Sequence, residues 1–452
     1  MKMTWKMAKH SLRICALIWI FGGCSDPNAY KKPSKDPQLV HEAVQQLTNT
    51  IVHDIFSPPV ASRIYAYPSI AAYEALRHDY PEYQTMAGQL SGLKPFPQPD
   101  PEKTYCFPLA SLEAFSEVGK SLIFSEAQIE AYRKKMHVHF EEMDMPSEIY
   151  ENSIKYGQAV AAHTLAWAEG DNYKETRTYP KYSVLDVKGR WKPTPPAYME
   201  AIEPHWNKIR PFVIDSATQF IPVRPTPYSL SENSQFYKEL MEVYEVKQQL
   251  TEEQEAIAKF WDCNPYVSHH RGHVMFATKK ITPGGHWMGI AKIASQANGD
   301  NQMESLHAYT ATAIALADAF ISCWDEKYRS CLIRPETVIN AHIDEDWKPL
   351  LQTPPFPEYT SGHSVISAAA GIALTNIYGN HFPFKDTTEE MYGLPARSYN
   401  SFKEASQEAA ISRLYGGIHY RPAIEDGVEQ GEKVGNFVVE NLSFQKSEMA
   451  GN

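Results

Sequence analysis

Apolar residues recur at steps of three and four along most of this chain. The first such run comprises Val40, Ala43, Val44, Leu47, Ile51 and Ile55. A repeat of this period forms one apolar stripe along an α-helix. Comparable runs follow at residues 59–78, 125–137, 148–168, 233–247, 251–261, 303–325, 364–378, 402–415 and 423–440. Because few segments alternate as strands do, the pattern predicts an all-α fold made of helical bundles.

One long segment, residues 170–230, breaks the helical pattern. The prolines that interrupt it include Pro180, Pro193, Pro195, Pro196 and Pro211. Long irregular segments in compact domains often cover a functional site. We therefore expect this segment to influence access to such a site.

A second unusual segment, residues 310–321, is almost entirely apolar. It is shorter than the roughly 20 residues that cross a bilayer as a helix, and it contains Asp318. Both features favour a buried core helix over a membrane span.

The first residues have a different pattern. Four basic residues precede an apolar stretch, residues 14–21, that is too short to span a bilayer. The stretch ends at Phe21-Gly22-Gly23-Cys24, which resembles the lipobox of a bacterial lipoprotein, although Phe21 is atypical at its position. An ordinary secretory signal or a short membrane anchor is the alternative.

These features predict the organisation of the chain. We expect a lipoprotein signal peptide at residues 1–23, a lipidated Cys24, a tether at residues 24–38 and one folded domain at residues 39–445. The protein would then be exported and anchored to a bacterial membrane, on its periplasmic or cell-surface face.

Charge and cysteine content narrow the possible partners. The 452-residue chain has a net charge of −11, so nucleic-acid binding is not expected. Once Cys24 is acylated, Cys106, Cys263, Cys323 and Cys331 remain as possible disulfide partners. Their spacing shows no metal-ligand pattern.

Candidate chemistry begins at Lys327 and Arg334, which are seven residues apart. On one continuous helix, two turns would bring both cations to nearly the same face, and Pro335 would end or kink that helix. Alone, such a pair is typical of a solvated helix face.

The next candidate segment is Ser361-Gly362-His363, which leads directly into a helical run. Thr360 or Ser361 can cap that helix, and Gly362 lets the backbone approach a ligand closely. The free N–H groups of a helix start bind anions, and His363 could exchange a proton with the bound group. Alone, the same residues are typical of an ordinary helix start.

The last candidate segment runs from Ser412-Arg413 to His419. Arg413 and His419 would point to different faces of an unbroken helix, but Gly416-Gly417 supplies a break that lets both reach one ligand. An ordinary helix corner with a partly buried histidine is the alternative.

Together the three segments predict a pocket for a tetrahedral oxyanion such as phosphate or vanadate. They supply three cations, one hydroxyl, one glycine backbone and two histidines. His419 could attack phosphorus or donate a lone pair to a metal centre.

The three segments resemble the signature of a superfamily that contains type 2 phosphatidic acid phosphatases, bacterial class A acid phosphatases and vanadium-dependent haloperoxidases. That signature reads Lys-x6-Arg-Pro, then Pro-Ser-Gly-His, then Ser-Arg-x5-His-x3-Asp. The signature covers about residues 327–426, within a core of about residues 303–440.

Further similarities favour the soluble haloperoxidase branch. Trp324 looks like the tryptophan that this family places beside the halide site, and Phe356 occupies a position where chloroperoxidases carry Phe and bromoperoxidases carry His. Asp262 resembles the acid that pairs with the arginine at Arg413, and residues 51–59 resemble soluble bacterial relatives. The resemblance implies paired four-helix bundles without a transmembrane core.

Two activities follow from the resemblance. In a haloperoxidase, the oxygens of a vanadate cofactor would be contacted by Lys327, Arg334, Ser361, Gly362 and Arg413. His419 would bind vanadium, His363 would accept a proton from hydrogen peroxide, and a halide would be oxidised. In a phosphatase, which needs no cofactor, the same pocket would bind a phosphomonoester, with His419 as the nucleophile and His363 as the acid.

The sequence departs from the signature at two positions. Thr360 replaces a proline, a mild change because Thr can also cap a helix. Ala423 replaces the aspartate that orients the histidine in the phosphatases, so the phosphohistidine route is the more compromised one unless a different group orients His419. A lipid-anchored oxyanion-binding protein without catalysis is the third possibility.

Overall fold

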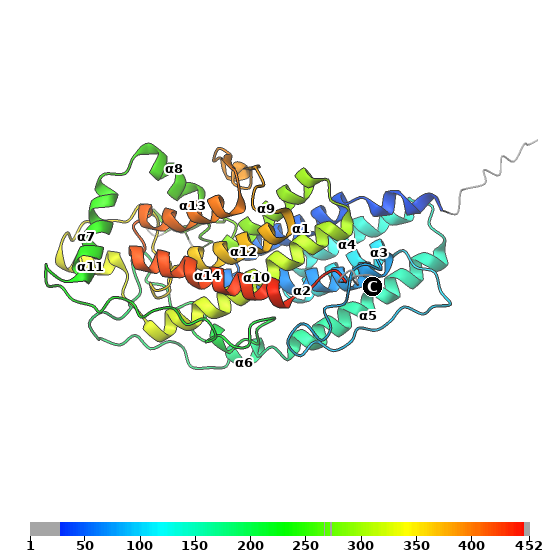
Figure 1. The fold of residues 1–452 in the computed structure, drawn as a ribbon, viewed down its shortest axis with the longest axis horizontal. Coiled ribbons are helices and arrows are strands. Elements are labelled where there is room, and N and C mark those ends of the chain that lie inside the picture. Colours follow the sequence, from blue (N-terminus) through cyan, green and yellow to red (C-terminus); the bar gives the residue numbers. More distant parts are fainter. Residues whose placement is uncertain (1–27, 266, 272–273, 447–452) are drawn as a thin grey trace, which may run out of the picture.

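The computed structural model describes residues 28–265, 267–271 and 274–446 and is predominantly helical (Figure 1). The expected signal peptide and Cys24 lie outside these residues. The α-helices are α1 (Gln38–Asp54), α2 (Pro58–Leu76), α3 (Phe107–Ser121), α4 (Glu126–Glu141), α5 (Ser147–Glu169), α6 (Tyr173–Thr176), α7 (Gln235–Gln248), α8 (Glu252–Phe260), α9 (Pro283–Asn298), α10 (Gln302–Ser330), α11 (Pro335–His342), α12 (Gly362–Tyr378), α13 (Phe402–Tyr415) and α14 (Arg421–Asn441). The all-α prediction is confirmed.

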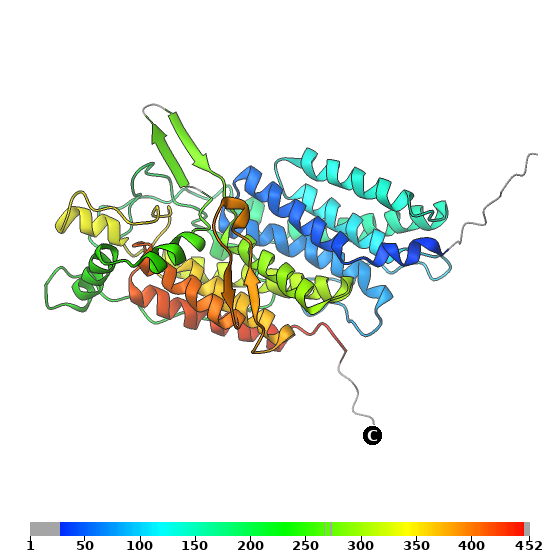
Figure 2. The same ribbon diagram turned by 90° about the horizontal axis from the view of Figure 1, so that it is seen from above.

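Strands and 3-10 helices are short. Antiparallel strands β1 (Val267–Arg271) and β2 (Val274–Thr278) form one hairpin, which projects from the body in Figure 2, and β3 (Phe384–Asp386) pairs with β4 (Arg397–Tyr399). The 3-10 helices are η1 (Ala29–Lys31), η2 (Pro33–Lys35), η3 (Arg77–Asp79), η4 (Trp206–Lys208) and η5 (Glu390–Tyr392).

The helices form two groups that share α10. In the N-terminal group, α2 packs against α3 and α5, while in the C-terminal group α12 packs against α13 and α14. Helix α10 contacts both α2 and α12, so it joins the two groups along the length of the molecule (Figure 1). An Asn301 capping box begins it, because the Asn301 side chain accepts the N–H of Glu304 and the Glu304 side chain accepts that of Asn301.

Helix α10 is the one helix in the described residues that is long and apolar enough to cross a membrane. Of its most apolar window, 94% is buried inside the protein. Asp318 accepts the backbone N–H groups of Phe212, Val213 and Ile214. The segment is therefore a core helix, as predicted.

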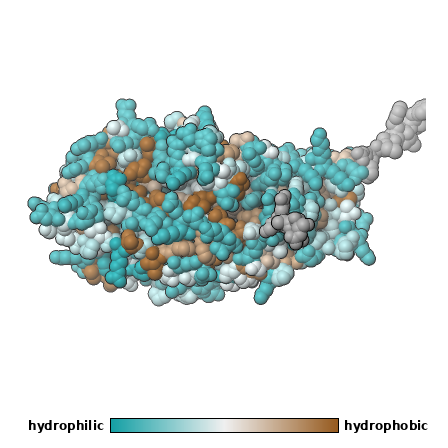
Figure 3. Space-filling view, viewed as in Figure 1, coloured by the Kyte–Doolittle hydropathy of each residue, from teal (hydrophilic) through white to brown (hydrophobic). Residues whose placement is uncertain are grey.

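The face of the molecule in Figure 3 is largely hydrophilic, with scattered apolar residues.

A row of glycines on α14 lets it approach α12 closely. A Cβ added to Gly431 would lie 2.1 Å from the backbone oxygen of Val365, and one at Gly427 would lie 2.9 Å from Cβ of Ser364. Any side chain at these positions would push the start of α12 away. The close contact fixes the backbone around Ser361, whose N–H donates to the carbonyl of Ala423 at 2.8 Å.

The described part of the expected tether, residues 28–38, is packed against the body. Tyr30 and Ser34 are buried, and the Gln302 amide donates to the backbone oxygens of Ser34 and Asp36. The possible disulfide partners Cys106, Cys263, Cys323 and Cys331 are all free and buried.

Candidate active site

Lys327 and Arg334 come from two helices, so the prediction of one continuous helix was wrong. Helix α10 ends at Ser330 with Cys331 in a left-handed conformation, whereas Arg334 is the N-cap of α11 and Pro335 begins that helix. A proline suits the first turn of a helix because no intrahelical N–H bond is lost there. The turn, and not helical periodicity, brings the two cations together.

Lys327 is fully buried and its ammonium contacts backbone oxygens. It donates to the carbonyls of Pro357 and Glu358, each at 3.1 Å, and to that of Thr360 at 2.5 Å. Burial lowers the pKa of Lys327 to about 7. Its three bonds hold the loop that leads into Ser361.

Arg334 contacts the loop that carries His419. Its Nε donates to the Phe356 carbonyl at 3.0 Å, and its Nη1 donates to the Ile418 carbonyl at 2.7 Å and to Nε2 of His419 at 3.1 Å. Its Nη2 is buried without a hydrogen-bond partner. One donor of this guanidinium therefore remains available beside His419.

The start of α12 provides backbone donors. Ser361 is the N-cap, and its hydroxyl accepts the N–H of Ser364 at 3.3 Å. Gly362 and His363 are the first residues of the helix, where N–H groups have no partner within the helix. The predicted cap and helix start are confirmed.

His363 lines the pocket, and its Nε2 is buried without a hydrogen-bond partner. Burial lowers its pKa well below the ordinary value, the charges of Arg413 and His286 lower it further, and a hydrogen bond to the Trp261 backbone opposes them. The ring is therefore neutral near pH 7, as a proton acceptor requires.

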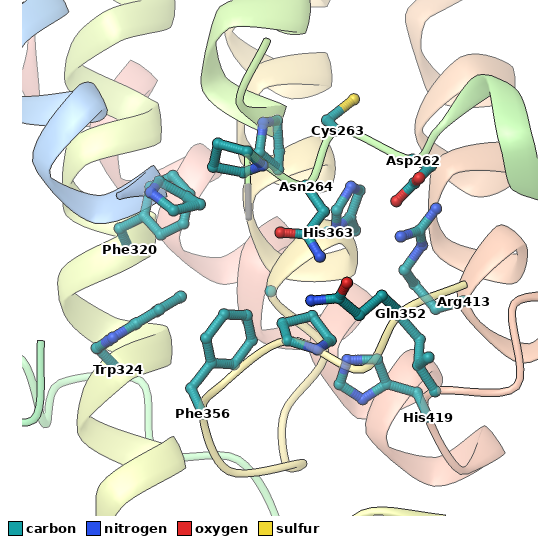
Figure 4. Close-up of a pocket in the computed structure, with 16 residues that line it drawn as sticks. Asp262, Cys263, Asn264, Phe320, Trp324, Gln352, Phe356, His363, Arg413 and His419 are labelled. Atoms are coloured by element: carbon teal, nitrogen blue, oxygen red, sulfur yellow. The ribbon is translucent and has the colours of Figure 1, made fainter. Parts of the chain in front are cut away.

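The expected pairing of Asp262 with Arg413 is not an ion pair in this structure. Asp262 forms its ion pair with Lys280 at 3.2 Å, and Arg413 donates to the Trp261 carbonyl at 2.7 Å and to the Ser412 hydroxyl at 2.9 Å. Asp262 still lies near the guanidinium (Figure 4), and its charge raises the pKa of Arg413, although burial lowers that pKa to about 10.

His419 is oriented by Glu358, a residue that the sequence analysis did not single out. Nδ1 of His419 lies 2.8 Å from Oε1 of Glu358, which also accepts the N–H of Tyr420 at 2.9 Å. Arg334 can only donate, so Nε2 of His419 accepts its N–H, and Nδ1 carries the proton that Oε1 of Glu358 accepts. Burial first, then the charges of Arg334 and Lys327, lowers the pKa of His419 well below its ordinary value.

Glu358 therefore supplies the carboxylate that seemed to be missing at Ala423. Ala423 is buried, and Asp426 instead accepts the Tyr359 hydroxyl at 2.9 Å. Burial raises the pKa of Glu358 to about 8, while Arg334 and Lys327 act in the opposite direction. A different group, from the loop before α12, therefore orients His419, and Ala423 does not compromise the phosphohistidine route.

Part of the predicted site, without Lys327, Arg334 and Ser361, lines one pocket. Its polar wall includes Gly362, His363, Arg413 and His419, and its apolar wall includes Phe320, Trp324 and Phe356 (Figure 4). The rings of Trp324 and Phe356 have centroids 5.0 Å apart. The indole N–H of Trp324 donates to the Ile202 carbonyl at 3.2 Å, so the pocket meets mainly the apolar part of this ring.

The polar wall also contains Asn264 and Gln352, which the sequence analysis did not identify. No residue of the 170–230 segment lines this pocket, although the segment is irregular as predicted. It packs behind the apolar wall, where the N–H of Ile202 donates to the Pro355 carbonyl at 3.0 Å.

The buried charges fit an anion. Lys327, Arg334 and Arg413 are 0%, 0% and 2% exposed, and within the described ranges none has a carboxylate at ion-pair distance. Buried cations without an ion-pair partner are costly, so a bound oxyanion would stabilise them. The unpartnered Nη2 of Arg334 and Nε2 of His363 are further groups that such a ligand could satisfy.

Comparisons with known proteins show which family this chain belongs to. Residues 307–446 match the family described as the VCPO second helical-bundle domain. A bacterial vanadium-dependent iodoperoxidase is 55% identical, with a TM-score of 0.87 over 91% of this chain and 98% of that chain. Among curated proteins, no match was found.

Two chloroperoxidase structures share the fold at lower identity. A holo-type bacterial vanadium-dependent chloroperoxidase is 16% identical, with a TM-score of 0.66 over 93% of this chain and 96% of that chain. An apo-type one is 17% identical, with a TM-score of 0.64 over 85% and 94%. With 55% identity to the iodoperoxidase over nearly its whole length, the chain belongs to the vanadium-dependent haloperoxidase family and is an enzyme.

Proposed function

We propose that this protein binds vanadate at His419 and oxidises halide with hydrogen peroxide, with iodide as the halide oxidised most readily. The observation that carries the proposal is the His419 ring, whose Nδ1 is held by Glu358 at 2.8 Å and whose Nε2 lies among buried cations. The 55% identity to an iodoperoxidase supports the choice of iodide.

The chain's own groups divide the work of binding. Nε2 of His419 would hold vanadium, while Arg334, Arg413 and the N–H groups of Gly362 and His363 would hold the oxygens. The vanadium of bound vanadate would act as a Lewis acid that activates peroxide, and the oxidation state of vanadium would not change.

His363 is suited to take a proton from hydrogen peroxide at Nε2. This atom has no other partner, and the lowered pKa keeps it unprotonated near pH 7. The buried charge of Lys327 lies beside the same loop and would favour negative charge developing in the pocket.

The apolar wall favours a large, weakly hydrated anion. Entry of a halide between Phe320, Trp324 and Phe356 removes its water, and this cost is smallest for iodide because its charge is spread over the largest radius. We therefore expect rates to fall in the order iodide, bromide, chloride.

Phosphomonoester hydrolysis is the second candidate. Glu358 orients His419 as a phosphohistidine mechanism also requires. Phosphate and vanadate have similar shape and charge, so the same contacts suit both.

The test uses the purified full chain, loaded with vanadate or left without it. We expect peroxide-dependent oxidation of iodide only after vanadate loading, and little hydrolysis of p-nitrophenyl phosphate in either preparation. Phosphate ester hydrolysis without halide oxidation at any vanadate concentration would overturn the proposal in favour of the phosphatase.

We also propose that the protein is exported and lipid-anchored at Cys24. The support is the sequence pattern of residues 1–24. Metabolic labelling with palmitate should label the wild type and not Cys24→Ala; equal labelling of both would refute the anchor.

A further inference from the structure

A second cluster of ligand-type side chains lies beside the active site and takes no part in the proposed reaction. Cys263 Sγ, Nδ1 of His286 and a carboxylate oxygen of Glu389 all lie within 4.8 Å of one another, and all three residues are buried. We propose that this cluster binds one zinc ion that holds together three segments around the pocket.

The distances between these atoms match the edges of a zinc coordination tetrahedron. Sγ to Nδ1 is 3.2 Å, Nδ1 to Oε1 of Glu389 is 3.5 Å, and Sγ to Oε1 is 3.9 Å. Usual zinc bond lengths at a tetrahedral angle give separations of about 3.4–3.6 Å. Small shifts would therefore place all three atoms at bonding distance from one ion.

Asp386 and Thr388 contact Nε2 of His286, so Nδ1 is the nitrogen on the side of Cys263 and Glu389. Its Nε2 lies 2.8 Å from Oδ2 of Asp386 and 2.8 Å from the Thr388 hydroxyl, which itself donates to Oδ1 of Asp386. A proton held on Nε2 in this way would leave Nδ1, which faces Cys263 and Glu389, as the nitrogen that binds the ion. Metal-binding histidines are commonly oriented by a carboxylate in this way.

Stacking holds the imidazole plane as well. The ring of Trp261 lies 4.4 Å from that of His286 at an angle of 15°. The ring therefore has little freedom to turn Nδ1 away from its two neighbours.

Hydrogen bonding alone leaves this cluster unsatisfied. Among the residues that the structure describes, Oε2 of Glu389 is buried without a partner, and the acceptor Oε1 has only long contacts to Sγ and Nδ1. A divalent cation would balance the charges of a thiolate and a carboxylate and remove this cost. Thiolate, imidazole and carboxylate together suit Zn²⁺ better than Mg²⁺ or Ca²⁺.

The position suggests a structural ion. Cys263 follows α8, His286 lies in the first turn of α9, and Glu389 lies between β3 and η5, so the ion would tie together both ends of the segment that contains the β1–β2 hairpin. The sulfur of Cys263 points away from His363 and His419 in Figure 4. Its loop neighbours Asp262 and Asn264 line the active-site pocket, whose wall the ion would therefore hold in place.

The test measures zinc in the purified full chain after incubation with Zn²⁺ and removal of the excess. We expect about one zinc per chain in the wild type and in the control variant Cys106→Ser, which changes another buried cysteine. Cys263→Ser and Glu389→Gln should each lose most of it. Zn²⁺ should raise Tm only in the proteins that bind it.

Two further measurements separate a lost site from a lost fold. Vanadate binding by Cys263→Ser and Glu389→Gln would show that both variants are folded, and Co²⁺ should give a sulfur-to-metal absorption band in the wild type that Cys263→Ser lacks. Equal zinc content in the wild type and in both folded variants, or no zinc in any protein, would overturn the proposal. Vanadium is measured separately, so neither result depends on haloperoxidase activity.

Discussion

Two buried histidines in this protein each contact a carboxylate at 2.8 Å, but they do so through opposite ring nitrogens. His419 uses Nδ1 to reach Glu358, whereas His286 uses Nε2 to reach Asp386. The carboxyl group accepts the proton of one nitrogen and so decides which nitrogen is the acceptor or ligand.

The charges around the other ring nitrogen differ between the two histidines. Nε2 of His419 lies 3.1 Å from Arg334 and close to other buried cations, whereas Nδ1 of His286 faces the thiol of Cys263 and the carboxyl group of Glu389. A histidine paired with a carboxylic acid thus suits an oxyanion at His419 and a cation at His286. The residue type alone does not specify the ligand.

The largest expected effect is that of His419→Ala. Loss of the only imidazole that we place on vanadium should reduce iodide oxidation at least about 10³-fold, the scale of losing one group at a reacting centre, and should abolish tight vanadate binding. Vanadate affinity by equilibrium dialysis and the rate of iodide oxidation measure the two effects. His342→Ala, at an exposed histidine of α11, is the control, and wild-type vanadate affinity in His419→Ala would contradict the assignment.

Replacement of Glu358 tests how His419 is oriented. Glu358→Ala should weaken vanadate binding or slow the reaction by about 100-fold, the upper range for an outer-shell partner, and Glu358→Gln should fall between it and the wild type because an amide oxygen still accepts. The exposed Glu345→Ala is the control.

The double variant sharpens this test. Adding Ala423→Asp to Glu358→Ala should restore part of the vanadate affinity, because a carboxylate returns near His419 from the position that the family signature uses. Unchanged affinity in Glu358→Ala itself would show that Glu358 does not orient the ring.

Asp386→Asn should disrupt the contact between His286 and Asp386 without affecting that between His419 and Glu358. Zinc affinity should fall by about 10–100-fold, while vanadate affinity stays at the wild-type value. Competition with a zinc chelator and equilibrium dialysis of vanadate measure the two. An equal loss of both affinities would mean that the substitution disturbs the fold rather than one site.

The smallest effect expected is a pH dependence through Lys327. Its pKa of about 7 in the empty pocket means that it is protonated below pH 7 and neutral above it. An anion binds the protonated form better, so vanadate affinity should weaken above pH 7 by up to about tenfold per pH unit. In Lys327→Met, vanadate affinity should vary less with pH, because only the ionisation of vanadate itself remains. The same dependence of affinity on pH in the variant and the wild type would contradict the role of Lys327.

Most helices could be predicted from the sequence because each has one apolar face. Helices α3, α6, α9 and α11 were not predicted. Helix α6 has only four residues, and α9 begins with Pro283-Gly284-Gly285, residues that usually interrupt helices.

The candidate site was predicted in part. The three motifs are local, so their residues could be read from spacing, whereas the turn between α10 and α11 could not, because Cys331 in a left-handed conformation is not a common turn residue. Glu358 lies within the second motif, but its contact with His419, 61 residues away, depends on how two loops pack.

The sequence by itself determined the helical class of this protein and singled out candidate residues for an oxyanion site, because helical periodicity and motif spacing are local properties of the chain. Only the tertiary structure decided which carboxylate orients His419 and that Cys263, His286 and Glu389 meet. These contacts join residues far apart in the chain, and their geometry is set by the packing of helices and loops against a common core.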